Sequence, residues 1–224
     1  MPIVRVLPGV VQLRTMAFSY YAADDHLIVD AAFSRNPRKI LDGLRQAGYR
    51  HGDISSIVVT HSHPDHMGGL AALREATDAR VCALEPERAY IVGEASLMRT
   101  SLLGRLLMGL IRTRPAPVDR VLREGDTVGG FRVIATPGHT PGHLSLWDPA
   151  RSLVIAGDAA RVIGKYVGPA PKRMNTDHAQ AIESFRKLAR LDFENLVDGH
   201  GEVVSGGAAV RLRTSPFFVP DPAP

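Results

Sequence analysis

Four metal-binding side chains lie within six positions, directly after a short apolar run. His61, His63, Asp65 and His66 belong to the sequence THSHPDHMGG, which follows residues 54–60. One turn can deliver several imidazole and carboxylate ligands with little extra ordering entropy, and these donors suit zinc or another borderline divalent ion. The chain must therefore fold so that a buried strand ends at a metal site, and we expect that site to hold two metals.

Strand and helix patterns alternate along the chain, which predicts an α/β fold. Expected strands cover residues 4–11, 16–21, 26–31, 54–60, 80–84, 131–136, 144–148, 153–156 and 195–197, of which the first three should be antiparallel. Expected helices cover residues 37–47, 67–75 and 177–191. The metal-binding turn thus lies between a strand and a helix, where side chains project from a rigid edge.

Length and composition suit one domain. The chain has 224 residues, of which 45% are hydrophobic, and we expect a single domain over residues 1–215 followed by a Pro-rich tail, 216–224, that is extended or disordered. The start MPIVRVLPGV lacks the pattern of a secretory signal, so a cytoplasmic protein is expected. Cys82 is the single cysteine, which rules out an internal disulfide and leaves His and Asp as metal ligands.

The charge pattern argues against nucleic-acid binding. The formal net charge is +4, but Lys and Arg are scattered along the chain instead of gathered into a run with interleaved aromatics. We therefore expect a small-molecule substrate, with at most a mild attraction for anions.

Residues 97–111 form an apolar segment with Arg105 and Arg112 opposite its leucines. The segment is too short and too charged to span a membrane. It is interpreted as a helix packed on the core, a lid over the active site or a contact in a homodimer. If it is a lid, Leu103 and Leu107 would contact an acyl chain of the substrate.

Further candidate ligands follow later strands. TPGHTPGH contains His139 and His143, VIAGDAA contains Asp158, and LVDGHG contains His200. Each motif alone has an ordinary structural interpretation as a turn or a cap. Their position directly after successive predicted strands favours one shared site.

The ordered pattern HxHxDH, GHT, GD and GH resembles the metallo-β-lactamase-fold hydrolase superfamily. The resemblance implies a four-layer αββα sandwich that binds two divalent metal ions, for which zinc is expected and iron or manganese are alternatives. It also implies a ligand set in which one ion is held by three histidines, the second by Asp65 with two histidines, and an aspartate bridges both: His61, His63 and His139; Asp65, His66 and His200; Asp158. His143 is interpreted as a support for a ligand.

Such a site suits hydrolysis. Two ions can share a water, lower its pKa and present a bridging hydroxide, so that no Ser or Cys nucleophile is needed. Asp65 can orient the hydroxide and carry a proton toward the leaving group. We therefore expect a dinuclear-metal hydrolase that cleaves an ester, thioester or lactone bond.

Asp158 lies where many true β-lactamases of this fold have a cysteine, so β-lactam hydrolysis is not expected. The pattern is more similar to glyoxalase II and the acyl-homoserine lactonases. Glyoxalase II adds a helical carboxy-terminal region for which the sequence after His200 is too short. Lactonases typically have a tyrosine where this chain has Arg161, so Arg161 is a candidate for an anionic substrate group and Tyr166 for a hydroxyl.

Other functions remain open. Some members of the superfamily keep HxHxDH but use one iron, held by two histidines and an aspartate, to oxidise glutathione persulfide. A noncatalytic metal-containing binding module and a nuclease are further alternatives. Metal content separates the first of these from a hydrolase.

Overall fold

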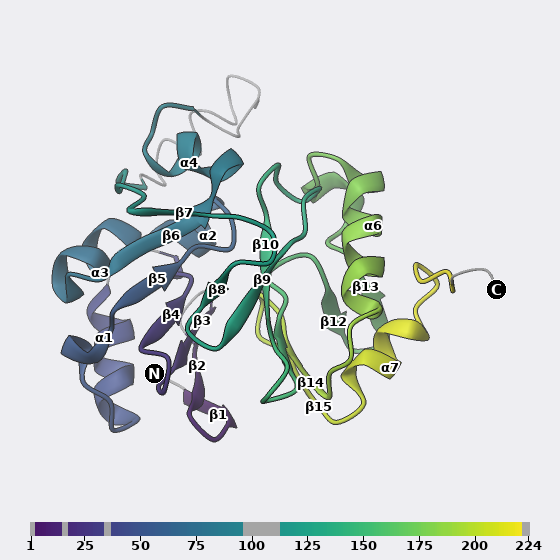
Figure 1. The fold of residues 1–224 in the computed structure, drawn as a ribbon, viewed down its shortest axis with the longest axis horizontal. Coiled ribbons are helices and arrows are strands. Elements are labelled where there is room, and N and C mark those ends of the chain that lie inside the picture. Colours follow the sequence, from purple (N-terminus) through teal and green to yellow (C-terminus); the bar gives the residue numbers. More distant parts are fainter. Residues whose placement is uncertain (1–2, 15–17, 34–36, 96–112, 221–224) are drawn as a thin grey trace. The chain divides into compact units, whose positions relative to one another are not determined.

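The computed structural model describes residues 3–14, 18–33, 37–95 and 113–220, in two compact units, Met1–Leu122 and Arg123–Pro224. Each unit contains one large sheet and its own helices (Figure 1). Whether residues 1–215 form one domain stays a prediction. The apolar segment 97–111, with Leu103 and Leu107, lies outside the described residues.

The first unit is built on a seven-stranded sheet whose strands follow the order of the chain. The first four strands pair antiparallel, as predicted, and the last four pair parallel. The strands are β1 (Ile3–Leu7), β2 (Val10–Arg14), β3 (Phe18–Ala22), β4 (Leu27–Val29), β5 (Ser56–Val58), β6 (Arg80–Leu84) and β7 (Arg120–Leu122).

The single strand predicted for residues 4–11 is wrong, because the structure forms β1 and β2 with a turn between them. Gly9 has φ +73°, a conformation that side chains with a Cβ rarely adopt. Its carbonyl accepts a hydrogen bond from Ala23 N at 2.7 Å. Apolar residues lie on both sides of the Pro-Gly turn, so the hydrophobic pattern predicted one strand across it.

Two helices, α1 (Pro37–Gln46) and α3 (Leu70–Thr77), lie together on one face of this sheet (Figure 1). Buried Leu44 and Leu73 join a core cluster with Ile57 of β5. The unit also contains the 3₁₀ turn η1 (His51–Asp53) and the helix α4 (Glu85–Ile91), which follows β6 directly. This packing fixes β5, which precedes the turn that contains His61, His63, Asp65 and His66.

The predicted helix over residues 67–75 is broken into α2 (Pro64–Met67) and α3. Gly69 lies at the break, and a Cβ built there would be 2.4 Å from the carbonyl oxygen of Ala31. Any larger residue would push away the loop after β4. The break therefore lets that loop approach the turn that contains His66, whose carbonyl accepts a hydrogen bond from Ala31 N at 2.6 Å.

The second unit contains a six-stranded sheet in the order β15-β14-β11-β10-β9-β8. Its neighbours pair antiparallel except for the parallel pair β11–β14, and β12 and β13 form a separate hairpin. The strands are β8 (Thr127–Val128), β9 (Phe131–Ala135), β10 (Leu144–Asp148), β11 (Leu153–Ile155), β12 (Arg161–Ile163), β13 (Tyr166–Gly168), β14 (Asn195–Val197) and β15 (Val203–Ser205).

Two helices, α6 (His178–Ala189) and α7 (Ala208–Arg213), lie beside one another in this unit (Figure 1). Asp177 caps α6 by accepting a hydrogen bond from Gln180 N at 3.0 Å. The 3₁₀ turn η2 (Lys172–Met174) precedes the cap. The predicted helix and its polar start are thus both present.

The start of the predicted Pro-rich tail packs against the second unit instead of extending away. Phe217 and Phe218 contact its core cluster, and the Phe217 ring lies 6.4 Å from that of Phe185. Arg186 Nε donates a hydrogen bond to the Phe217 carbonyl at 2.8 Å. Apolar burial therefore orders residues that composition alone assigned to a tail.

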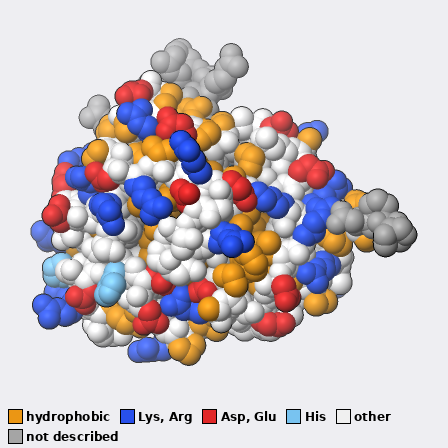
Figure 2. Space-filling view, viewed as in Figure 1, with side chains coloured by type: hydrophobic (Ala, Val, Ile, Leu, Met, Phe, Trp, Pro, Cys, Tyr) orange, Lys and Arg blue, Asp and Glu red, His pale blue; other side chains and the backbone are white. Residues whose placement is uncertain are grey.

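Charged side chains of both signs are interspersed on the face drawn in Figure 2. Arg74 forms an ion pair with Asp119 at 3.0 Å, and Arg114 forms one with Glu75 at 2.5 Å. Within the described ranges, every helix is too short or too polar to cross a membrane.

Candidate metal centre

The first group of donors lies in the turn that joins β5 to α2. His61 and His66 are buried, whereas His63 and Asp65 are half-buried. The carboxylate of the fully buried Glu87 on α4 accepts a hydrogen bond from Ser62 N at 2.8 Å and holds the turn from behind. The turn is thus shaped by the fold before any ion binds.

Asp30, which follows β4, organises this turn. Its carboxylate accepts hydrogen bonds from Thr60 N and Thr60 Oγ1, both at 2.8 Å, and lies 2.8 Å from His66 Nδ1. Because a carboxylate accepts hydrogen bonds, His66 carries its proton on Nδ1 and has its lone pair on Nε2, as a metal ligand would require. Asp30 itself adopts φ +61°, so the loop after β4 is strained to bring the carboxylate here.

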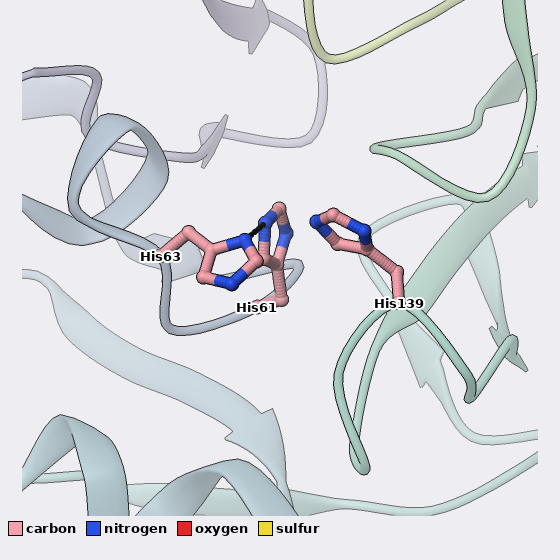
Figure 3. Close-up of side chains that lie close together, drawn as sticks. All are labelled: His61, His63 and His139. Carbon is pink, nitrogen blue, oxygen red and sulfur yellow. Dashed lines mark hydrogen bonds between the residues drawn. The ribbon is translucent and has the colours of Figure 1, made fainter. Parts of the chain in front are cut away.

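His61 is oriented through the same network. Because the Thr60 hydroxyl donates to Asp30, it accepts from His61 Nδ1, which lies 3.1 Å away. His61 Nε2 then lies 3.0 Å from His63 Nδ1 (Figure 3). Two nitrogens bound to one tetrahedral zinc would be roughly 3.3 Å apart, so this spacing fits a shared ion.

Asp65 lies beside His66, with 3.7 Å between its Oδ2 and His66 Nε2. Its side chain is 29% exposed, in contrast to the buried imidazole next to it. Asp65 therefore combines contact with a candidate ligand and access to solvent.

The second unit positions His139 in the loop between β9 and β10. Asn175 Oδ1 lies 3.1 Å from His139 Nδ1, while its Nδ2 donates to the Ala170 carbonyl and lies 2.8 Å from His178 Nδ1. This arrangement assigns the Nδ1 proton to His139 and directs its Nε2 for coordination. Gly138 has φ +123°, and a Cβ there would lie 2.2 Å from a backbone nitrogen of α6.

His143 is bonded at both ring nitrogens within the second unit. Its Nε2 accepts a hydrogen bond from Asp158 N at 2.9 Å, and its Nδ1 lies 2.8 Å from Thr136 Oγ1. The imidazole is therefore neutral, and it joins the His139 loop to the Asp158 backbone.

Asp158 brings the donors of the second unit together. Its buried Oδ2 lies 3.0 Å from His200 Nε2 and 3.5 Å from His139 Nε2. The three residues come from the loops after β9, β11 and β14, as the sequence order predicted. One carboxylate oxygen facing two imidazoles is an arrangement that a bridging ligand requires.

A second buried carboxylate, Asp198, holds the His200 loop. It accepts backbone hydrogen bonds from Val162 at 3.2 Å, His200 at 2.9 Å and Glu202 at 3.1 Å. Burial raises the pKa of Asp198, while these backbone donors act in the opposite direction. The carboxylate ties the start of β12 to the loop of a candidate ligand.

Two of the candidate substrate residues, Arg161 and Tyr166, lie on the β12–β13 hairpin. The Tyr166 hydroxyl donates a hydrogen bond to the Pro169 carbonyl at 2.5 Å, and its ring contacts Phe217 edge-on. The Tyr166 hydroxyl thus donates its proton to a group of the same unit and not to a substrate. Arg161 begins β12, opposite Gly168.

Residues 14–200 match the model of the metallo-β-lactamase superfamily. The chain belongs to this superfamily. It is 27% identical to a probable metallo-hydrolase of Bacillus subtilis (strain 168), YflN, over 88% of this chain and 83% of that protein. It is 31% identical to a hydroxyacylglutathione hydrolase of Cereibacter sphaeroides over 80% of its own length, but spans only 61% of that enzyme.

Structural similarity agrees with the family match. A metallo-β-lactamase from Cronobacter sakazakii with the HARLDQ motif superposes with a TM-score of 0.71 at 22% identity, covering 89% of this chain and 80% of that one. The predicted α/β fold class, the αββα sandwich of the metallo-β-lactamase type, is thereby confirmed. The chain is a member of a metallo-hydrolase superfamily whose His and Asp clusters can bind metal.

Four polar residues that support the donors were missed in the sequence: Asp30, Glu87, Asn175 and Asp198. Two of them gave a weak signal, because LIVD and NLVD each place an aspartate directly after an apolar strand. Glu87 and Asn175 gave none.

Proposed function

We propose that the two groups of donors together hold two divalent ions, expected to be zinc, and that the protein hydrolyses an ester-like carbonyl bond. Iron or manganese are the alternative metals. The donor chemistry fits, because His and carboxylate side chains are ligands that zinc prefers, and Figure 3 draws three of the proposed donors. The assigned sets are His61, His63 and His139 for one ion, Asp65, His66 and His200 for the other, with Asp158 as the bridge.

The observation that carries this proposal is the orientation of the histidines. His61, His66 and His139 each have Nδ1 within hydrogen-bonding distance of an oxygen, which leaves Nε2 as the coordinating nitrogen. Such partners fix the tautomer of metal ligands. His143 differs in its Nε2, which accepts a hydrogen bond from the backbone N–H of Asp158 and so does not offer its lone pair to an ion.

Bound divalent ions would supply Lewis acidity and a nucleophile derived from water near neutral pH. The half-buried Asp65 would accept the proton of that water and deliver it to the leaving group. Asp30 holds His66 in place while Asp65 acts, and Asn175 does the same for His139.

The proposed substrates are small molecules with a thioester, ester or lactone bond. Support comes from the similarity to a hydroxyacylglutathione hydrolase, although this chain covers only part of that enzyme. An acyl chain on the substrate, a homodimer and a cytoplasmic location stay predictions.

The test combines elemental analysis of protein purified without added metal with turnover of a thioester, an acyl lactone, an aryl ester and a phosphodiester. About two zinc ions per chain and carbonyl turnover that His61→Ala abolishes support the proposal. One iron per chain, with oxygen consumed in the presence of glutathione persulfide, would replace the hydrolase with a dioxygenase.

The role of Asp65 has its own test. Asp65→Asn should lower kcat at least 100-fold, because proton transfer by a positioned carboxylate contributes about 10²–10⁴-fold. The midpoint of thermal unfolding should stay within a few degrees of the wild-type value, as it should in the exposed control Asp42→Asn. Wild-type turnover with full metal content in Asp65→Asn would remove this residue from the mechanism.

A further inference from the structure

Arg161 is a partly buried cation at the start of β12. Its Nε is inaccessible to solvent and has no hydrogen-bond acceptor among the described residues. Other arginines of the same unit are satisfied at this atom, since Arg186 Nε donates to Phe217 O and Arg213 Nε to Ala189 O, both at 2.8 Å. An unsatisfied buried N–H is costly. Arg161 as a whole is only partly buried, so the remaining N–H groups of its guanidinium can meet an acceptor from solution.

Asp198 does not fill this role. The Asp198 carboxylate is close enough for Arg161 to act on it electrostatically, but its oxygens accept the backbone hydrogen bonds of Val162, His200 and Glu202. The salt bridges of the described residues do not include Arg161. Its guanidinium therefore retains its capacity to bind an anion.

Arg161 is also tied to the candidate metal ligands of its unit. It follows Asp158 by three residues, across the buried Ala159 and Ala160. The Asp198 carboxylate joins Val162 N, in the same strand, to His200 N. A short, rigid path thus connects Arg161 to Asp158 on one side and to His200 on the other.

Basic residues are the only charged residues between Asp158 and Asp177. Residues 159–176 contain four cations, Arg161, Lys165, Lys172 and Arg173, and no acid. Lys165, Lys172 and Arg173 are exposed, and η2 carries two of them next to Asn175, the partner of His139. Positive charge on such a surface raises the local concentration of anions.

We propose that Arg161 binds a carboxylate of the substrate, so that the enzyme selects carboxylate-bearing esters or thioesters. This inference rests on the proposed hydrolase function and names its substrate class. The guanidinium presents parallel N–H donors that match the two oxygens of a carboxylate. Arg161 is thus a specificity-determining residue, and the bond to be cleaved lies elsewhere in the substrate.

The test uses two pairs of esters that differ only in a carboxylate or a carboxamide. One pair, 4-carboxyphenyl and 4-carbamoylphenyl butanoate, carries the group on the leaving side; the other, monophenyl adipate and its terminal amide, carries it on the acyl side. In the wild type, kcat/KM for the acid of at least one pair should exceed that for the amide about tenfold or more. Arg161→Gln should remove this preference, mainly by raising KM for the acids.

Arg173→Gln is the matched control, because it removes the same charge from an exposed position on η2. It should retain most of the preference, which separates a specific contact from the general field. The preference of Arg161→Lys for the acid should lie between those of the wild type and Arg161→Gln, since lysine keeps the charge and loses the paired donors. Equal preference in the wild type and Arg161→Gln for both pairs overturns the assignment of Arg161 while leaving the hydrolase proposal intact.

A binding measurement keeps the inference testable if none of the esters is hydrolysed. Calorimetric titration with 4-hydroxybenzoate and adipate, each against its amide, should show tighter binding of at least one acid to the wild type. Arg161→Gln should abolish that difference. Equal affinities for acid and amide, in both proteins and for both compounds, would refute carboxylate recognition. This result would be independent of the hydrolase proposal.

Discussion

Replacing Asp30 by Asn separates the organisation of the metal site from the ligands themselves. Asp30 accepts two hydrogen bonds from Thr60 and contacts His66 Nδ1, and it is only 2% exposed. Asn retains one neutral acceptor oxygen, so all three contacts lose the negative charge and the two at Oδ2 also lose their acceptor. A hydrogen bond to a charged group contributes about 1.5–3 kcal/mol, so with partial relaxation the free energy of unfolding should fall by roughly 3 kcal/mol.

The same change should act on metal binding. An amide NH₂ facing His66 favours the proton on Nε2, the nitrogen that should coordinate the ion. Loss of such a supporting partner typically weakens metal affinity about 10–100-fold. Urea unfolding of the metal-free protein measures the first effect, and competition with a chelator of known affinity measures the second.

Asp119→Asn is the control, because Asp119 also accepts three hydrogen bonds in the same unit, from Arg74 and from Val81 N. It contacts none of the candidate ligands in these bonds, so it should destabilise the protein without changing metal affinity. Wild-type affinity for both ions in Asp30→Asn would show that the network around His66 does not prepare a metal site.

Three further changes test other parts of the structure. Asn175→Ala should weaken metal binding about 10–100-fold by releasing His139, with little loss of stability, as chelator competition and thermal unfolding will show. Gly138→Ala should unfold at clearly lower urea concentration than Gly125→Ala: both residues have positive φ, which costs about 1–2 kcal/mol with a Cβ, but only Gly138 lacks space. Cys82 should react slowly with a thiol reagent at pH 8 until the protein is unfolded, because burial raises the pKa of its thiol and leaves less thiolate at that pH.

The sequence was most informative where chemistry and strand ends coincide. The ligand candidates were identifiable because each follows an apolar run, and the loop after a strand has one direction in which to project its side chains. The boundaries of β6, β10 and β14 agree with their predicted ranges for the same reason.

Features that depend on partners distant in the sequence were not predictable. The break at Gly69 exists because of the carbonyl of Ala31, and the Phe217 contact exists because of Phe185. Asn175 resembles any loop asparagine until its amide is seen beside His139. Hydrophobic periodicity reports burial along one segment, and these contacts lie between segments.

His143 couples the positions of two candidate ligands. Its neutral ring is hydrogen-bonded through Nε2 to the Asp158 backbone and through Nδ1 to Thr136, which precedes the His139 loop. The rigid ring therefore keeps these two groups at a fixed separation. His139 and Asp158 should therefore move together, and a change that breaks the hydrogen bonds of His143 should displace both residues. Loss of metal on that side of the centre should be cooperative, with no state in which His139 is displaced and Asp158 remains in place.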